Sequence, residues 1–123
     1  MILLDSNILI YSASQQYLHL RELIKKSKAS CSIISKLEVL GYHKINAEQI
    51  TFFEAIFQVI DILPITDDVI NQAIKYRQRM KMSAGDAIIA ASAKIFKCDL
   101  YTNNVEDFVN VKDIKIINPI KKK

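Results

Sequence analysis

The chain has 123 residues, of which half are hydrophobic and 24% are charged. This balance excludes an intrinsically disordered protein, and we expect a single folded domain over residues 1–123. The formal net charge of +4 is concentrated in two basic clusters, at positions 75–81 and in a tail at 121–123. A local cationic patch can steer a polyanion, but charge alone does not separate this role from a solvated helix face and a solubilising tail.

The apolar runs are far shorter than the roughly 20 residues that cross a bilayer, so we expect no membrane span. The N-terminus also lacks the basic region and cleavage site of a secretory signal. Cys31 and Cys98 lie far apart and match no metal-ligand spacing, which favours two buried free thiols. Together these features predict a reducing, cytoplasmic location.

The first residues predict a buried strand that ends at a carboxylate. Ile2–Leu4 is a continuous apolar run, as in a parallel-sheet strand covered on both faces. Asp5 follows at the carboxyl end of this strand, where open α/β sheets bind their ligands. Taken alone, however, an Asp in this place is more often the N-cap of the next helix, here expected after Asn7.

The chain then alternates between helices and strands. An amphipathic helix is expected from Tyr17 to the lysines at 25–28, and a strand over Ala29–Ile33. Ser35 is a credible N-cap for the following helix, with Glu38 as its capping-box partner. Glu38 points either to solvent or into the mouth of the sheet, and composition does not choose between the two.

Two longer helices precede the second acidic position. Residues 47–59 have apolar and aromatic side chains at helical spacing, residues 60–65 suit a short strand, and Thr66 or Asp67 can cap the next helix. Residues 83–93 form a helix of small residues that can pack closely against a sheet, with Asp86 at its start. The expected basic cluster lies just before it and consists of Lys75, Arg77, Arg79 and Lys81.

The last predicted elements are a strand over Asp99–Thr102, a polar turn at Asn103–Asn104, a helical turn through Asp107–Phe108 and a strand over Ile114–Ile117. The alternation of strands and helices predicts an α/β fold with a parallel sheet covered by helices.

Four segments resemble the successive motifs of PIN-domain nucleases, and most of all the VapC-type toxins of bacterial toxin–antitoxin pairs. They are Leu4–Tyr11, Ser35–Leu40, Gly85–Ala91 and Tyr101–Phe108, in the family's order over nearly the full length. The resemblance implies a three-layer α/β/α fold with a central parallel sheet of about four to five strands. It also implies an endoribonuclease that cleaves RNA, forms a homodimer and is inhibited by a cognate antitoxin protein.

The resemblance implies roles for particular residues as well. Positions matching Asp5, Glu38 and Asp86 form an acidic pocket that binds Mg²⁺ or Mn²⁺ and cleaves RNA. Where the family often has a fourth acid, this chain has Asn104, followed by an acid at Asp107. This departure leaves the second metal position open.

The chemistry of such a site is independent of the family. Mg²⁺ takes oxygen ligands, and phosphodiester hydrolysis needs an activated water and a stabilised leaving oxygen. We expect Asp5 and Asp86 to hold the tighter ion, with Glu38 as a further ligand or a water-orienting base. Clustered carboxylates repel one another, so without metal at least one should hold its proton more tightly than usual. We expect Asn104 and Asp107 to support a second, weaker ion or to fix the pocket by hydrogen bonds. Thr102 and Ser6 could hydrogen-bond the acids or a phosphate, and Arg79 and Lys81 are candidates to contact the RNA strand.

Alternatives remain at this stage. Asn104 also suits a PIN-like RNA-binding or protein-interaction module without catalysis. A phosphatase of the haloacid dehalogenase type would need a second Asp where this chain has Asn7, and a response-regulator receiver would need an acidic pair near the first strand. Phe52, Phe53 and Phe57 could form an exposed interface, although aromatic residues at helical spacing are more often core.

Overall fold

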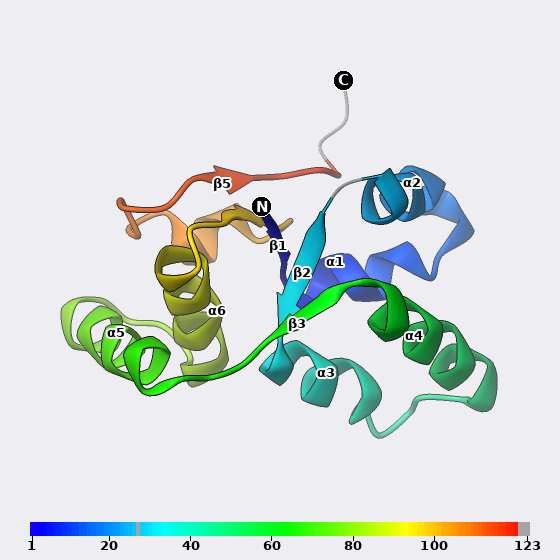
Figure 1. Ribbon diagram of the computed structural model, residues 1–123, viewed down its shortest axis with the longest axis horizontal. Helices are drawn as coiled ribbons and strands as arrows, with labels where there is room; N and C mark the ends of the chain where they lie inside the picture. The colour runs from blue at the N-terminus through cyan, green and yellow to red at the C-terminus, as the bar shows by residue number, and fades with distance from the viewer. Residues whose placement is uncertain (27, 121–123) are drawn as a thin grey trace.

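A parallel sheet of five strands forms the centre of the molecule, in the order β3-β2-β1-β4-β5 (Figure 1). The computed structural model describes residues 1–26 and 28–120, so the basic tail at 121–123 lies outside the described residues. All four strand pairings are parallel, which confirms the predicted α/β fold and sheet. The strands are β1 (Ile2–Leu4), β2 (Ala29–Ser32), β3 (Asp61–Leu63), β4 (Asp99–Tyr101) and β5 (Ile116–Ile117).

Helices cover both faces of this sheet, in the three layers that the resemblance implied (Figure 1). The side chains of Leu3 and Leu4 are fully buried, but they belong to different cores because successive residues of a strand point to opposite faces. Leu3 packs with α5 (Asp67–Arg79) and α6 (Ala84–Ile95). Leu4 packs with the other layer, made of α1 (Ser6–Ser12), α2 (Leu18–Lys26), α3 (Ile33–Leu40) and α4 (Ala47–Val59).

Most predicted helices lie where the periodicity placed them, and their caps explain why. Residues 47–59 are helical as expected, and Thr66, rather than Asp67, caps α5 by accepting a hydrogen bond from the Val69 amide. The aromatic residues of α4 divide as burial preference suggests, because Phe53 and Phe57 lie in the core while Phe52 is only partly buried. Two short 3-10 helices complete the fold, η1 (Gln15–Tyr17) and η2 (Val105–Phe108).

The predicted start of α3 was wrong. The helix begins at Ile33, and its N-cap is Ser32, whose hydroxyl accepts a hydrogen bond from the Ile34 amide at 3.2 Å. Ser35 lies inside the helix and is fully buried. The strand therefore ends one residue earlier than its β-branched composition suggested, because a capping serine was already available at its last position.

A polar contact fastens the segment before β5 to the helices beside it. Asp113 accepts hydrogen bonds on both carboxylate oxygens, from the Tyr76 hydroxyl at 2.8 Å and from the Lys94 ammonium at 2.6 Å. Tyr76 comes from α5 and Lys94 from α6, so one carboxylate connects three segments.

Two further expectations concern the cysteines and membrane-spanning helices. Cys31 and Cys98 are free and buried, as predicted. Over residues 1–26 and 28–120, none of the helices has the length and apolar character needed to cross a membrane.

Candidate functional site

The candidate site lies at the carboxyl ends of β1 and β4, which are neighbours in the sheet although almost 100 residues separate them in sequence. The chain runs from β1 outward to β3 and then returns to place β4 on the other side of β1. Such a reversal of strand order leaves a crevice at the strand ends. A cavity of about 250 Å³ opens there, lined by Asp5, Ser6, Asn7, Ile10, Glu38, Asp86, Ile89 and Asn104. The structure thus brings together the three acids that the sequence singled out.

Asp5 is the N-cap of α1, as one of its two interpretations predicted, and it also lines the cavity. Its Oδ1 accepts a hydrogen bond from the Ile8 amide at 3.0 Å and so caps α1, while its Oδ2 accepts one from the Thr102 hydroxyl at 2.5 Å. Burial raises the pKa of Asp5, and the charge of Asp86 raises it further, although the bonds from Thr102 and Ile8 act in the opposite direction. A carboxylate held this firmly is pre-oriented, and none of the described Lys or Arg residues forms an ion pair with it.

Glu38 lines the cavity at the mouth of the sheet. It takes no part in a capping box, so the expected pairing with Ser35 as a cap was wrong. Its Oε1 accepts a hydrogen bond from the Ser6 hydroxyl at 2.5 Å, across 32 residues of sequence. The same Ser6 oxygen lies 2.9 Å from the Ser35 hydroxyl, so two helices, α1 and α3, meet at this contact. Ser6 therefore orients Glu38, and Ser35 supports Ser6.

Gly85 allows Glu38 to approach the first turn of α6. A Cβ atom at position 85 would lie only 2.9 Å from Glu38 Oε2, closer than carbon and oxygen atoms normally approach. Sequence reasoning gave this glycine little weight. The available signal was its position in the first turn of a helix rich in alanine, where glycine is the less stable choice.

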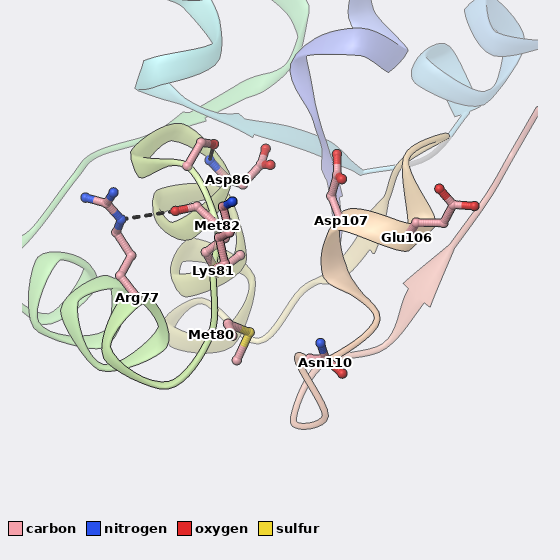
Figure 2. A pocket seen from close by; sticks show the side chains of 9 residues that line it. Arg77, Met80, Lys81, Met82, Asp86, Glu106, Asp107 and Asn110 are labelled. Carbon is pink, nitrogen blue, oxygen red and sulfur yellow. Dashed lines mark hydrogen bonds between the residues drawn. The ribbon is translucent and has the colours of Figure 1, made fainter.

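Asp86 lies between two hollows. Its backbone amide donates to the hydroxyl of Ser83, the N-cap of α6, at 3.0 Å, and its side chain is half-buried. Burial raises the pKa of Asp86, and the charges of Asp107 and Glu38 add to this effect, whereas Ser83 lowers it. Asp86 lines the 250 Å³ cavity described above, which we call the acidic cavity, and a second hollow of about 530 Å³ shown in Figure 2. Asp107 belongs to this second hollow and not to the first.

The remaining predicted site residues surround these hollows at different distances. Thr102 is fully buried behind Asp5, and its hydroxyl also accepts a hydrogen bond from the amide of Asn104 at 2.9 Å, which fixes the start of the loop. Lys81 lines the second hollow together with Arg77. Arg79 lines neither of these two hollows, because it lies two residues after Arg77 on α5 and so points to nearly the opposite side of the helix. It lines a third hollow of about 380 Å³.

The donor set fits a hard divalent cation in kind. Carboxylate oxygens are the ligands that Mg²⁺ and Mn²⁺ prefer, and within residues 1–26 and 28–120 no Lys or Arg lines this cavity to neutralise them. Among the residues described by the structure, no three His, Cys, Asp or Glu side chains lie close enough to hold an ion as they stand. Ligation by all three acids would therefore require a rotamer change, for which the exposed side chain of Glu38 has the most freedom.

Comparisons with known proteins identify the family and the fold of the chain. Residues 2–114 match the family model described as the PIN domain. No curated protein sequence matches the chain. Among solved structures, the chain is similar to a toxin–antitoxin complex from Klebsiella pneumoniae, with 24% identity, a TM-score of 0.80, and coverage of 99% of this chain and 100% of that one.

Two further structures show the same fold similarity. DNA-bound VapBC from Salmonella typhimurium has 20% identity and a TM-score of 0.83, covering 95% of this chain and 96% of that one. VapC20 from Mycobacterium tuberculosis, described as a sarcin–ricin loop cleaving toxin, has 16% identity and a TM-score of 0.69, covering 94% and 98%. At these identities the likeness establishes the fold.

The raised pKa of Asp86 generates a prediction about stability. A raised pKa means that the folded state binds this proton more tightly than the unfolded state, so the ionised carboxylate destabilises the fold above the raised pKa. We expect Asp86→Asn to increase the free energy of unfolding at pH 7, and this gain to disappear as the pH falls below the ordinary value of 3.8. Urea denaturation across this pH range, with a metal chelator present, measures the effect.

The matched control is Glu22→Gln, which removes a negative charge from an exposed position on α2. It should change stability little at either end of the pH range. The assigned electrostatics would be contradicted if Asp86→Asn did not increase the free energy of unfolding at pH 7, or if it increased it equally in acid.

Proposed function

The chain belongs to the PIN-domain family, whose members are typically nucleases, and on that premise we propose that it is a metal-dependent endoribonuclease of the VapC type. The observation that supports this function best is the meeting of Asp5, Glu38 and Asp86 around one cavity at the sheet's carboxyl edge. Three carboxylates, with no cation among the described lining residues, suit a divalent ion.

In this proposal Asp5 and Asp86 hold Mg²⁺ or Mn²⁺, and Glu38 is a further ligand or orients the attacking water. The ion, when bound, would make that water nucleophilic and stabilise the leaving oxygen. Thr102 and the Ile8 amide keep Asp5 oriented, and Ser6 does the same for Glu38. Asn104 can hydrogen-bond water or phosphate from the cavity wall, while Asp107 supports a second, weaker ion from the adjacent hollow.

The proposed partners are RNA, a cognate antitoxin and a second copy of the chain, in the cytoplasm. The relative from Klebsiella pneumoniae is described as a toxin–antitoxin complex, and the VapBC relative is described as bound to DNA. Apolar side chains remain exposed on two helices here, Ile33 and Leu37 on α3 and Ile70 and Ile74 on α5. A homodimer would bury surface of this kind.

A second candidate is an RNA-binding module without catalysis. It is favoured by Asn104, an amide on the cavity wall where the motif often has a fourth acid. Purified protein incubated with short RNA and Mg²⁺ or Mn²⁺ separates the two, because a binding module would retard the RNA and leave it intact.

We predict that Asp5→Asn and Asp86→Asn each lower metal-dependent RNA cleavage by about a hundredfold or more, since each removes a charged ligand worth several kcal/mol in the transition state. Asp107→Asn should cost less, about tenfold. Asn caps helices as well as Asp does, so Asp5→Asn keeps the α1 cap. Rates on a defined RNA, with circular dichroism to verify folding, provide the measurement. Undiminished cleavage by a folded Asp5→Asn or Asp86→Asn variant would refute the assignment.

Gly85→Ala should separate stability from activity. Alanine stabilises helices relative to glycine by up to about 1 kcal/mol, so the variant should unfold at the same or a higher urea concentration. Its methyl group would displace the Glu38 carboxylate, and we expect cleavage to fall roughly tenfold, as for other residues that orient a ligand.

A double-mutant cycle with Glu38→Gln tests the cause of that loss. If Gly85→Ala acts through Glu38, it should lower cleavage much less when the Glu38 carboxylate is already absent. Equal losses in both backgrounds, or full activity in Gly85→Ala alone, would show that the close approach has no catalytic role.

A further inference from the structure

We propose that a single-stranded RNA extends from the acidic cavity in one direction only, along a groove between α5 and the segment 105–113, and that Arg79 and Lys112 hold phosphates at the far end of this groove. The proposal rests on the proposed function and adds to it a direction and two contact residues. We call this surface the α5 groove.

The α5 groove is continuous with the acidic cavity because neighbouring hollows share lining residues. Asp86 lines both the acidic cavity and the second hollow. Met80 and Asn110 line both the second hollow and the third. In Figure 2, Asp86 lies at one end of the second hollow, and Met80 and Asn110 lie at the other. A strand whose phosphate is cleaved beside Asp86 can therefore continue past Asn110 to Lys112.

The charge of the α5 groove changes from acidic to basic with distance from the cavity. The second hollow is lined by Arg77 and Lys81 on one side and by Glu106 and Asp107 on the other, so it carries both charges. A phosphate there is repelled by η2 and held against α5. Arg77 is already directed by a hydrogen bond from its Nε to the Met82 carbonyl at 3.1 Å, which leaves its terminal nitrogens available.

In the third hollow the balance is positive. Arg79 and Lys112 line it with a single carboxylate, Asp113, and both oxygens of Asp113 already accept bonds from Tyr76 and Lys94. Within residues 1–26 and 28–120, Lys94–Asp113 is the one ion pair, so Arg79 and Lys112 are exposed cations that no described acid pairs with. Exposed unpaired cations next to an acidic catalytic centre are suited to phosphate contacts.

The direction of the RNA strand follows from the residues that line the acidic cavity on the sides away from the α5 groove. In the part of the chain that the structure describes, no Lys or Arg lines that cavity, and its walls on α1 and α3 present Ser6, Asn7, Ile10 and Glu38. The α5 groove is thus the side on which hollows with cationic walls adjoin the cavity. Met80 and Met82 add polarisable apolar surface between the cations, against which bases can pack.

The test measures how a labelled single-stranded RNA binds as a function of salt. An Asp86→Asn background keeps the RNA uncut, and into it we introduce Arg79→Gln with Lys112→Gln. Loss of two phosphate contacts should reduce the slope of log affinity against log salt by about 1.4. The matched control is Lys25→Gln with Lys26→Gln, which removes the same charge from exposed positions on α2, on the other side of the molecule from α5 (Figure 1). The control should leave the slope nearly unchanged.

A second experiment, on protein that retains Asp86, tests the direction in which the RNA leaves the acidic cavity. RNAs with one mapped cleavage site are extended upstream, downstream or not at all. We expect one extension, and not the other, to raise kcat/KM, and the Arg79→Gln and Lys112→Gln pair to abolish that gain. Equal gains from both extensions, or a salt slope that falls equally in the α2 control or in neither pair, would overturn the proposal. If the wild-type chain cleaves no RNA, the proposed function fails, while the salt slope still decides whether the α5 groove binds the strand.

Discussion

The convergence of three carboxylates at one edge of a parallel sheet is the constraint on which the rest of the site depends. Like charges repel, and burial raises the pKa of both Asp5 and Asp86, so the arrangement is unfavourable for the isolated protein. It persists because each acid is held by contacts of its own: Thr102 and the Ile8 amide hold Asp5, Ser6 holds Glu38, and the start of α6 carries Asp86. A divalent cation would relieve the same repulsion, which links metal binding to stability.

The cations that could bind a polyanion lie apart from the three acids. Among the described residues, no Lys or Arg lines the acidic cavity, so in the proposed function an RNA phosphate would enter it together with a bound metal ion. The cations lie beyond it, along the α5 groove, where Asp113 is already satisfied by Tyr76 and Lys94. The carboxylates proposed for catalysis and the cations proposed for RNA binding therefore lie in separate, adjoining hollows.

Sequence reasoning predicted the elements well because their signals are local. The apolar run before Asp5, the helical spacing of residues 47–59 and the small residues after Asp86 each specify an element directly. It failed where a choice depended on tertiary contacts. The sequence pointed to Ser35 as the cap of α3, whereas the end of β2 makes Ser32 the cap. The approach of Gly85 to Glu38 and the separation of Arg79 from the acids also arise from packing between distant segments.

The most direct test of the site is to locate a bound ion by anomalous diffraction from crystals of the protein soaked in Mn²⁺. The account predicts one dominant peak within about 2.2 Å of carboxylate oxygens from both Asp5 and Asp86, with Glu38 turned toward it directly or through water. A peak confined to Glu106 and Asp107, or none at Mn²⁺ concentrations that support RNA cleavage, would contradict it.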